Sequence, residues 1–181
     1  MDGSSCSIYK YENDFGVCSR NLELKENDKN TFWNIARKLN LNERLTKFQK
    51  DYKRNIMLQG EVCGEGIQKN KDKLKGQNIY IFDIFDIDEK RNVSTSERVG
   101  ILSSLNEMDT NNQIHHVPLL EIINIFEIYP TLEEILQYAD GPGLNSKTRE
   151  GIVCKLIPKN ESKTIVSFKV INNKYLLKNN D

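Results

Sequence analysis

Residues 55–87 read NIMLQGEVCGEGIQKNKDKLKGQNIYIFDIFDI, and this stretch decides the fold class. Its two apolar runs, Asn55 to Val62 and Asn78 to Ile87, predict buried strands. The second run is the stronger signal, because large apolar side chains stand close together along it. The connection between the runs is polar and rich in lysine. The stretch therefore predicts two strands joined by an exposed segment.

Further strands are expected on both sides of this stretch. Ser4 to Lys10 and Gly16 to Arg20 flank a turn-rich link, which predicts a β-hairpin. Two more strand-like runs, residues 152–157 and 164–171, stand near the end of the chain, before a short extension at 175–177.

Three helices are expected from capping residues placed ahead of apolar faces. One begins at Asn30 or Thr31 and runs to about residue 50. The others follow Ser94 and Thr131, each with a glutamate three residues later, the pattern of a capping box. Strands outnumber helices, and several neighbouring strands have links too short for parallel crossovers. The sequence predicts one α+β domain over residues 1–181, with mostly antiparallel sheets.

The bulk composition predicts a soluble, cytoplasmic protein. No apolar run approaches the ~20 residues that a membrane span needs, and no basic-then-apolar leader opens the chain. The four cysteines have no Cys-x-x-Cys spacing, so we expect buried free thiols. His115 and His116 have no nearby ligand set, which favours an exposed pair over a metal site.

The net charge is zero, but the charges are unevenly placed. Lys plus Arg against Asp plus Glu number 15 against 11 in residues 1–78, 3 against 12 in 79–140 and 8 against 3 in 141–181. Basic ends around an acidic middle could form a groove that attracts a phosphate backbone. The plainer interpretation is a set of solvated faces, and Lys69, Lys71, Lys73 and Lys75 alternate as in an ordinary exposed segment.

Residues 141–148, GPGLNSKT, nearly spell a phosphate-binding P-loop, with Ser146 in place of the second glycine. A P-loop follows a buried strand and opens a helix. Here an expected helix precedes the segment and an expected strand follows it. The context therefore argues against a P-loop.

Five short motifs follow the opening Met1-Asp2-Gly3 in a fixed order. They are residues 17–21 (VCSRN), 59–68 (QGEVCGEGIQ), 79–84 (IYIFDI), 150–155 (EGIVCK) and 167–171 (SFKVI). Together they resemble the ordered motifs of ATP-dependent RNA ligases, most closely the branch with an OB-type domain ahead of its nucleotidyltransferase domain. In that superfamily the nucleophile is the lysine of Lys-x-Asp-Gly. Asp2 and Gly3 match this motif, so the lysine would stand one position before Met1 and the chain would be N-terminally truncated.

The resemblance implies a nucleotide cleft of the ligase core, described as ATP-grasp-like, between antiparallel sheets. Asp2 and Gly3 would hold the nucleophile, and Arg20 would contact a phosphate or ribose oxygen. Glu61 would contact the ribose or support the metal. From the residues alone, Glu61 is a costly carboxylate in an otherwise apolar strand, or an edge-strand carboxylate in water.

The resemblance also makes Phe82 the ring that stacks on adenine. By strand alternation Phe85 lies on the opposite face and is the better core residue. Glu150 would serve a divalent metal, Mg²⁺ or Mn²⁺, and Lys169 would contact the α-phosphate of ATP. Relatives often have a second lysine two residues later, where this chain has Ile171, and Lys174 or Lys178 are possible substitutes.

The implied function is the adenylyltransferase domain of an ATP-dependent RNA ligase, which joins 3′-hydroxyl and 5′-phosphate ends of nicked or broken RNA. The partners would be ATP and RNA, with no membrane and no obvious protein partner. Two alternatives remain open at this point. One is another polynucleotide ligase or a capping enzyme, and the other is a non-catalytic nucleotide- or RNA-binding remnant.

Overall fold

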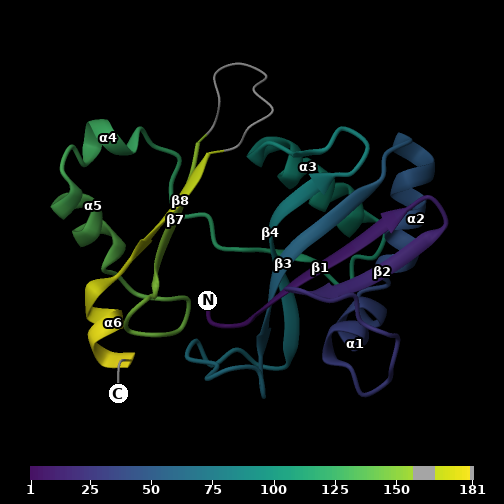
Figure 1. Ribbon diagram of the computed structural model, residues 1–181, viewed down its shortest axis with the longest axis horizontal. Coiled ribbons are helices and arrows are strands. Elements are labelled where there is room, and N and C mark those ends of the chain that lie inside the picture. The colour runs from purple at the N-terminus through teal and green to yellow at the C-terminus, as the bar shows by residue number, and fades with distance from the viewer. Residues whose placement is uncertain (157–165, 180–181) are drawn as a thin grey trace.

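The computed structural model describes residues 1–156 and 166–179 and has a larger and a smaller part, which lie on opposite sides of the N-terminus (Figure 1). The larger part is a six-stranded sheet in the order β2-β1-β3-β4-β5, with β6 paired to β4. Its strands are β1 (Ser4–Tyr11), β2 (Asp14–Ser19), β3 (Ile56–Gly64), β4 (Gln77–Asp86), β5 (Arg91–Asn92) and β6 (His115–His116). All pairs are antiparallel except β4 with β6, which is parallel. The prediction of a mostly antiparallel α+β fold is confirmed in this mixed sheet.

Three helices pack against one face of the sheet and form the main core. They are α1 (Thr31–Lys38), α2 (Leu41–Tyr52) and α3 (Thr95–Glu107). Ile8, Leu58 and Ile81 from the three central strands are fully buried in this core with Leu45 and Leu105 from the helices. The opposite face of the sheet is therefore free to carry polar side chains.

The single helix expected from residue 31 to about 50 is two helices. Asn40 separates α1 from α2 in a left-handed conformation, with φ 50° and ψ 36°, which asparagine adopts more readily than most residues. Leu39 and Leu41 are both almost fully buried. In one continuous helix these two side chains would point about 160° apart, toward nearly opposite faces. The break lets both of them enter the core.

A β-bulge at Phe82 shifts the alternation of β4. Gln59 on β3 pairs with Asp83, whereas the next residue, Gly60, pairs with Ile81, so Phe82 has no partner opposite it. Ile81 and Ile84 are both fully buried on the core face although three positions separate them. The expectation that Phe85 lies on the core face is therefore wrong, because it assumed unbroken alternation. Phe85 is only partly buried and is absent from the core.

The smaller part contains a two-stranded hairpin and three short helices (Figure 1). The elements are β7 (Gly151–Lys155), β8 (Ser167–Ile171), α4 (Ile125–Ile128), α5 (Leu132–Ala139) and α6 (Asn173–Asn179). Ile135 and Ala139 of α5 pack on Ile152 and Val170 of the hairpin in a second, small core. The expected strands at 152–157 and 164–171 are present where described, and their inner ends at 157 and 164–165 lie outside the described residues. The 175–177 extension is helical.

Local features of the chain bear on four expectations from the sequence. Thr131 and Glu134 form the expected capping box at the start of α5. Residues 141–148 follow a helix and precede β7, so their context is not that of a P-loop. All four cysteines are free, although only Cys6 and Cys63 are fully buried. Within the part of the chain that is described, no helix is both long and apolar enough to cross a membrane.

Candidate functional site

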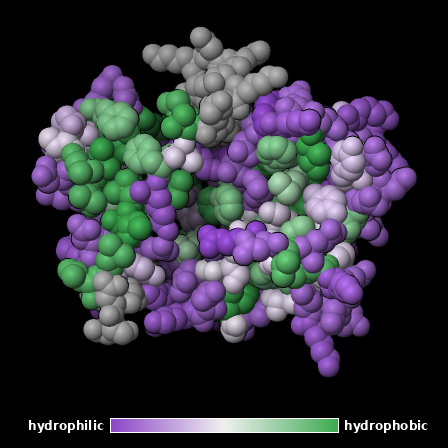
Figure 2. Space-filling model, in the orientation of Figure 1, coloured by the Kyte–Doolittle hydropathy of each residue, from purple (hydrophilic) through white to green (hydrophobic). Residues whose placement is uncertain are grey.

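The N-terminal segment lies between the sheet and the β7–β8 hairpin (Figure 1), where Figure 2 shows a hollow in this face of the molecule. Gly3 packs directly on β3 just ahead of β1. A Cβ atom on Gly3 would stand 2.4 Å from the Val62 carbonyl oxygen and 2.8 Å from Cγ of Glu61. Glycine is needed here for close backbone approach, and it brings the first residues of the chain against the Glu61 side chain.

Glu61 is a half-buried carboxylate on β3, beside Gly3. Burial raises its pKa above the usual value, and the nearby charge of Glu150 raises it further. The N-terminal ammonium group, a hydrogen bond from the Gly3 backbone N–H and the charge of Arg20 act in the opposite direction. Gly3, Arg20 and Glu150, all expected at the site, therefore each lie close enough to act on Glu61, although they come from distant parts of the sequence.

Glu150 and Lys169 form an ion pair on the hairpin side of the hollow. Glu150 immediately precedes β7, and Lys169 is in the middle of β8. The pairing of β7 with β8 brings these residues close together, because Gly151 pairs with Ile171 and Val153 pairs with Lys169. Both side chains remain partly exposed. The pair offers one carboxylate and one ammonium group to a ligand between the sheet and the hairpin.

Phe82 is held by a lysine for which sequence reasoning assigned no role. Lys155, at the end of β7, donates a hydrogen bond from Nζ to the Phe82 carbonyl oxygen at 2.8 Å. The same Nζ lies 2.7 Å from Oδ2 of Asp83 and 5.8 Å from the centre of the Phe82 ring. Burial lowers the pKa of Lys155, and Asp83 opposes this shift. The bulged residue is thus fixed by a cation from the other part of the molecule.

Asp83 is also paired with a buried arginine. Arg98 on α3 lies 3.3 Å from Oδ1 of Asp83 and donates from Nε to Nε2 of His116 at 2.9 Å. Burial lowers the pKa of both Arg98 and His116. His116 is therefore partly buried in a hydrogen-bonded network, whereas His115 is exposed and stacks on Tyr80. The expectation of an exposed histidine pair holds only for His115.

The remaining expected residues differ in their surroundings. Asp2 is partly buried and its charge reaches Cys63. Arg20 is exposed directly after β2. Of the proposed substitutes for a second lysine, Lys174 is paired with Asp140, and the side chain of Lys178 lies outside the described residues. Ile171 pairs with Gly151 at the base of the hairpin.

The carboxylates fit a divalent metal ion only together with further ligands. Glu61 and Glu150 supply hard oxygen donors, and burial together with the nearby charge of Glu150 raises the pKa of Glu61, so added positive charge would be favourable here. Over residues 1–156 and 166–179, no group of three or more His, Cys, Asp or Glu side chains could hold a metal ion. An ion at this position would therefore need oxygen atoms from a ligand such as a phosphate chain.

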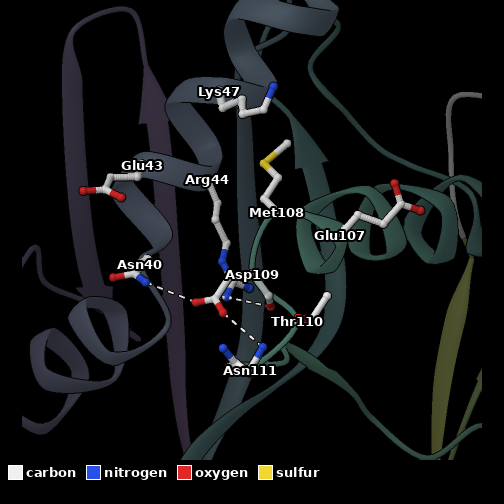
Figure 3. A pocket seen from close by; sticks show the side chains of 9 residues that line it. All are labelled: Asn40, Glu43, Arg44, Lys47, Glu107, Met108, Asp109, Thr110 and Asn111. Carbon is white, nitrogen blue, oxygen red and sulfur yellow. Dashed lines mark hydrogen bonds and ion pairs between the residues drawn. The ribbon is translucent and has the colours of Figure 1, made fainter.

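A second hollow lies between α2 and the loop after α3 (Figure 3). Arg44 is buried there, pairs with Oδ2 of Asp109 at 2.9 Å and donates to the carbonyl oxygen of Asn112 at 2.6 Å. Asn40 also donates to Asp109, at 3.1 Å. These contacts attach the loop to α2. The hollow belongs to the helical layer, and none of the expected site residues lines it.

Comparison with protein families matches residues 1–171 to the RNA ligase family. No curated protein matches the chain.

Solved structures of the Naegleria gruberi RNA ligase are similar to this chain over nearly its whole length. A single-substitution variant with ATP and manganese is 42% identical, with a TM-score of 0.84, over 99% of this chain and 49% of that one. The same ligase with pyrophosphate is 40% identical, with a TM-score of 0.83, over 99% and 49%. Another variant, with AMP and manganese, is 39% identical, with a TM-score of 0.80, over 98% and 49%. The chain spans about half the length of these structures.

Proposed function

The chain belongs to the RNA ligase family, and from this premise we propose that it is the adenylyltransferase domain of an ATP-dependent RNA ligase. The observation that carries the proposal is that four expected residues lie close together between the sheet and the hairpin. Gly3 packs against Glu61, the charge of Glu150 acts on Glu61, and Lys169 is paired with Glu150. The solved ligases that resemble the chain contain ATP, AMP or pyrophosphate and, in several cases, manganese. These ligands agree with a nucleotide substrate.

The proposed reaction has three steps. A lysine amine attacks the α-phosphorus of ATP, forms a phosphoramide bond to AMP and releases pyrophosphate. The AMP is then transferred to a 5′-phosphate of RNA. Finally a 3′-hydroxyl attacks this activated phosphate, forms the phosphodiester bond and releases AMP. We place the nucleophilic lysine directly before Met1 in a longer chain, because Asp2 and Gly3 match the Lys-x-Asp-Gly motif and Gly3 packs against Glu61.

The residues of this chain would bind and orient the nucleotide. Phe82 offers a ring for stacking on adenine, and its position is fixed by Lys155. Lys169 is placed to contact the α-phosphate and to stabilise the charge that develops there. Glu61 and Glu150 would hold a divalent ion, which would neutralise charge on the pyrophosphate leaving group. Lys169 is paired with Glu150 in the described structure, so nucleotide binding would exchange this contact for one to phosphate.

Intact-mass spectrometry after incubation with ATP and a divalent ion tests the proposal. The 181-residue chain should acquire no AMP, because none of its lysines is held at the position of the nucleophile. A chain extended at its N-terminus by its natural upstream segment, with a lysine directly before Met1, should acquire one AMP. Its Lys169→Met variant should acquire much less. An adduct on the 181-residue chain, or none on the extended chain, would contradict the proposal.

A further inference from the structure

The loop between β3 and β4, residues 65–76, has a feature that the nucleotide site does not use. It carries four lysines in 12 positions, together with Glu65 and Asp72. One of the two acids is withdrawn from the surface, because Asp72 is only 7% exposed. The exposed surface of this loop is therefore more basic than its sequence suggests.

The shape of the loop is fixed by contacts at its centre. Asp72 accepts hydrogen bonds from the Ser146 hydroxyl at 2.9 Å and from the Asn145 backbone N–H at 3.3 Å. Lys71 donates to the Tyr175 hydroxyl at 2.9 Å. Asn70 accepts from the Leu74 backbone N–H at 3.0 Å. The loop is thus attached to both the 141–148 segment and α6, so its exposed side chains extend from a defined backbone.

Lys69, Lys73 and Lys75 are the exposed lysines of this loop, and Lys147 is exposed on the segment attached to it. Within the described ranges none of these four forms an ion pair, whereas Lys47, Lys155, Lys169 and Lys174 do. Binding of an anion to an unpaired lysine costs little free energy, because no intramolecular contact has to be broken.

The loop also lies beside the candidate nucleotide site. Gln68 donates to the Ser4 hydroxyl at 3.4 Å, and Ser4 follows the glycine that packs against Glu61. In Figure 1 the loop is at the lower ends of β3 and β4, near the N-terminus and α6. A ligand that extends from the nucleotide site in this direction would meet the exposed lysines.

We propose that Lys69, Lys73, Lys75 and Lys147 form a docking surface for the phosphate backbone of an RNA strand. This inference rests on the proposed function and adds the direction in which the RNA leaves the site. A phosphate backbone fits better than a protein, because the exposed side chains of the loop are polar, its Ile67 is buried and its Leu74 is partly buried. Protein interfaces have a core of several apolar or aromatic side chains, whereas over residues 65–76 and 141–148 Leu144 is the single large apolar side chain that is exposed.

A charge-removal variant measured over a salt series tests the docking surface. The variant is Lys69→Gln, Lys73→Gln and Lys75→Gln, which keeps polar, unbranched side chains at these positions and removes three charges. The control is Lys25→Gln, Lys29→Gln and Lys50→Gln, which removes three charges from exposed lysines that precede α1 or lie on α2. Fluorescence anisotropy gives the dissociation constant of a labelled, 5′-phosphorylated single-stranded RNA, and calorimetry gives that of ATP.

The loop variant should bind RNA more weakly, and the slope of log K against log salt should be shallower by about 2, since each lost phosphate contact removes about 0.7. The control should keep the wild-type slope, and ATP affinity should be unchanged in both variants. An equal change in the control, or no change in the loop variant, overturns the docking surface, as does an absence of RNA binding by the wild-type chain. ATP binding is judged separately: if it is absent while the loop variant behaves as expected, the proposed function fails and the docking surface stands.

Discussion

Nζ of Lys155 on β7 lies 2.7 Å from Oδ2 of Asp83 on β4, so an ion pair joins the hairpin to the large sheet beside the candidate nucleotide site. Both side chains are less than one-fifth exposed. Arg98 approaches the other oxygen of the same carboxylate from α3. Asp83 therefore connects three elements of the molecule, and it follows directly the residue expected to stack on adenine.

A double-mutant cycle should reveal strong coupling between Lys155 and Asp83. We expect the Lys155→Met and Asp83→Asn substitutions to show a coupling energy of about 1–3 kcal/mol in chemical unfolding, as for contacting residues in one network. The matched control is Lys47 and Asp51, an exposed pair on α2 at 2.8 Å, for which about 0.3–0.5 kcal/mol is expected. Equal coupling in both pairs would show that Lys155 does not hold the two parts together.

Phe82→Leu should weaken nucleotide binding, whereas Phe85→Leu should not. Loss of an aromatic ring under a base typically costs about 1–3 kcal/mol, which corresponds to roughly 5- to 150-fold in affinity. Phe85 is a suitable control, because it is a partly buried phenylalanine of the same strand. Calorimetric titration with ATP or AMP measures the effect. Similar losses in the two variants would argue that Phe82 has no special contact with the nucleotide.

Gly3→Ala should displace the first residues of the chain with little effect on the global stability. The new methyl group would overlap the Val62 carbonyl oxygen and the Cys63 sulfur atom, and the N-terminal segment can move more readily than β3. ATP affinity should fall while the melting temperature changes little. Gly100→Ala is the control, since nothing lies within 4 Å of the new methyl group on α3. It should raise the stability by about 0.5–1 kcal/mol and leave ATP binding unchanged.

Glu61 should make the metal-free protein less stable as the pH rises. Its folded-state pKa is raised above the usual 4.5, mainly by burial, so the folded state binds the proton more tightly than the unfolded state. The unfolding free energy should therefore decrease as the pH rises through the interval between the two pKa values. Thermal unfolding between about pH 4 and pH 7 measures this, and Glu61→Gln should flatten the decrease.

Manganese should reverse the sign of this pH effect. Protonated Glu61 cannot serve as a ligand, so Mn²⁺ added together with ATP, whose phosphates supply the further ligands, should stabilise the wild-type protein more as the pH rises. Glu61→Gln should remove the pH dependence of this stabilisation. A stabilisation by Mn²⁺ that is the same in Glu61→Gln as in wild type at each pH would place the ion elsewhere.

The sequence predicted the strands of the large sheet well because their apolar runs are long and the residues between them form clear turns. The two main errors have one cause. Asn40 and Phe82 each interrupt a regular period, and local patterns assume that the period continues. Tertiary packing decides both cases, since the break at Asn40 buries two leucines and the bulge at Phe82 keeps isoleucines on the core face.

Individual residues of the candidate site could be named from the ordered motifs, but their partners could not. The roles of Lys155 and Asp83 remained hidden because the two residues are far apart in sequence and each looks like an ordinary polar residue of a strand. A carboxylate directly after an aromatic residue in an apolar strand was the available signal. The ion pair itself depends on how the hairpin lies against the sheet, which no local pattern encodes.

The bulge at Phe82 gives β4 two phases. Residues 79 and 81 face the core on one side of it, and residues 84 and 86 do so on the other, so odd positions give way to even ones. Deleting either residue 82 or residue 83 would restore a single phase and eliminate the extra position from which the ring extends. Length is thus as strictly specified here as residue type. In other sequences of this kind, a change from odd to even among buried positions would mark the place to look for the aromatic residue.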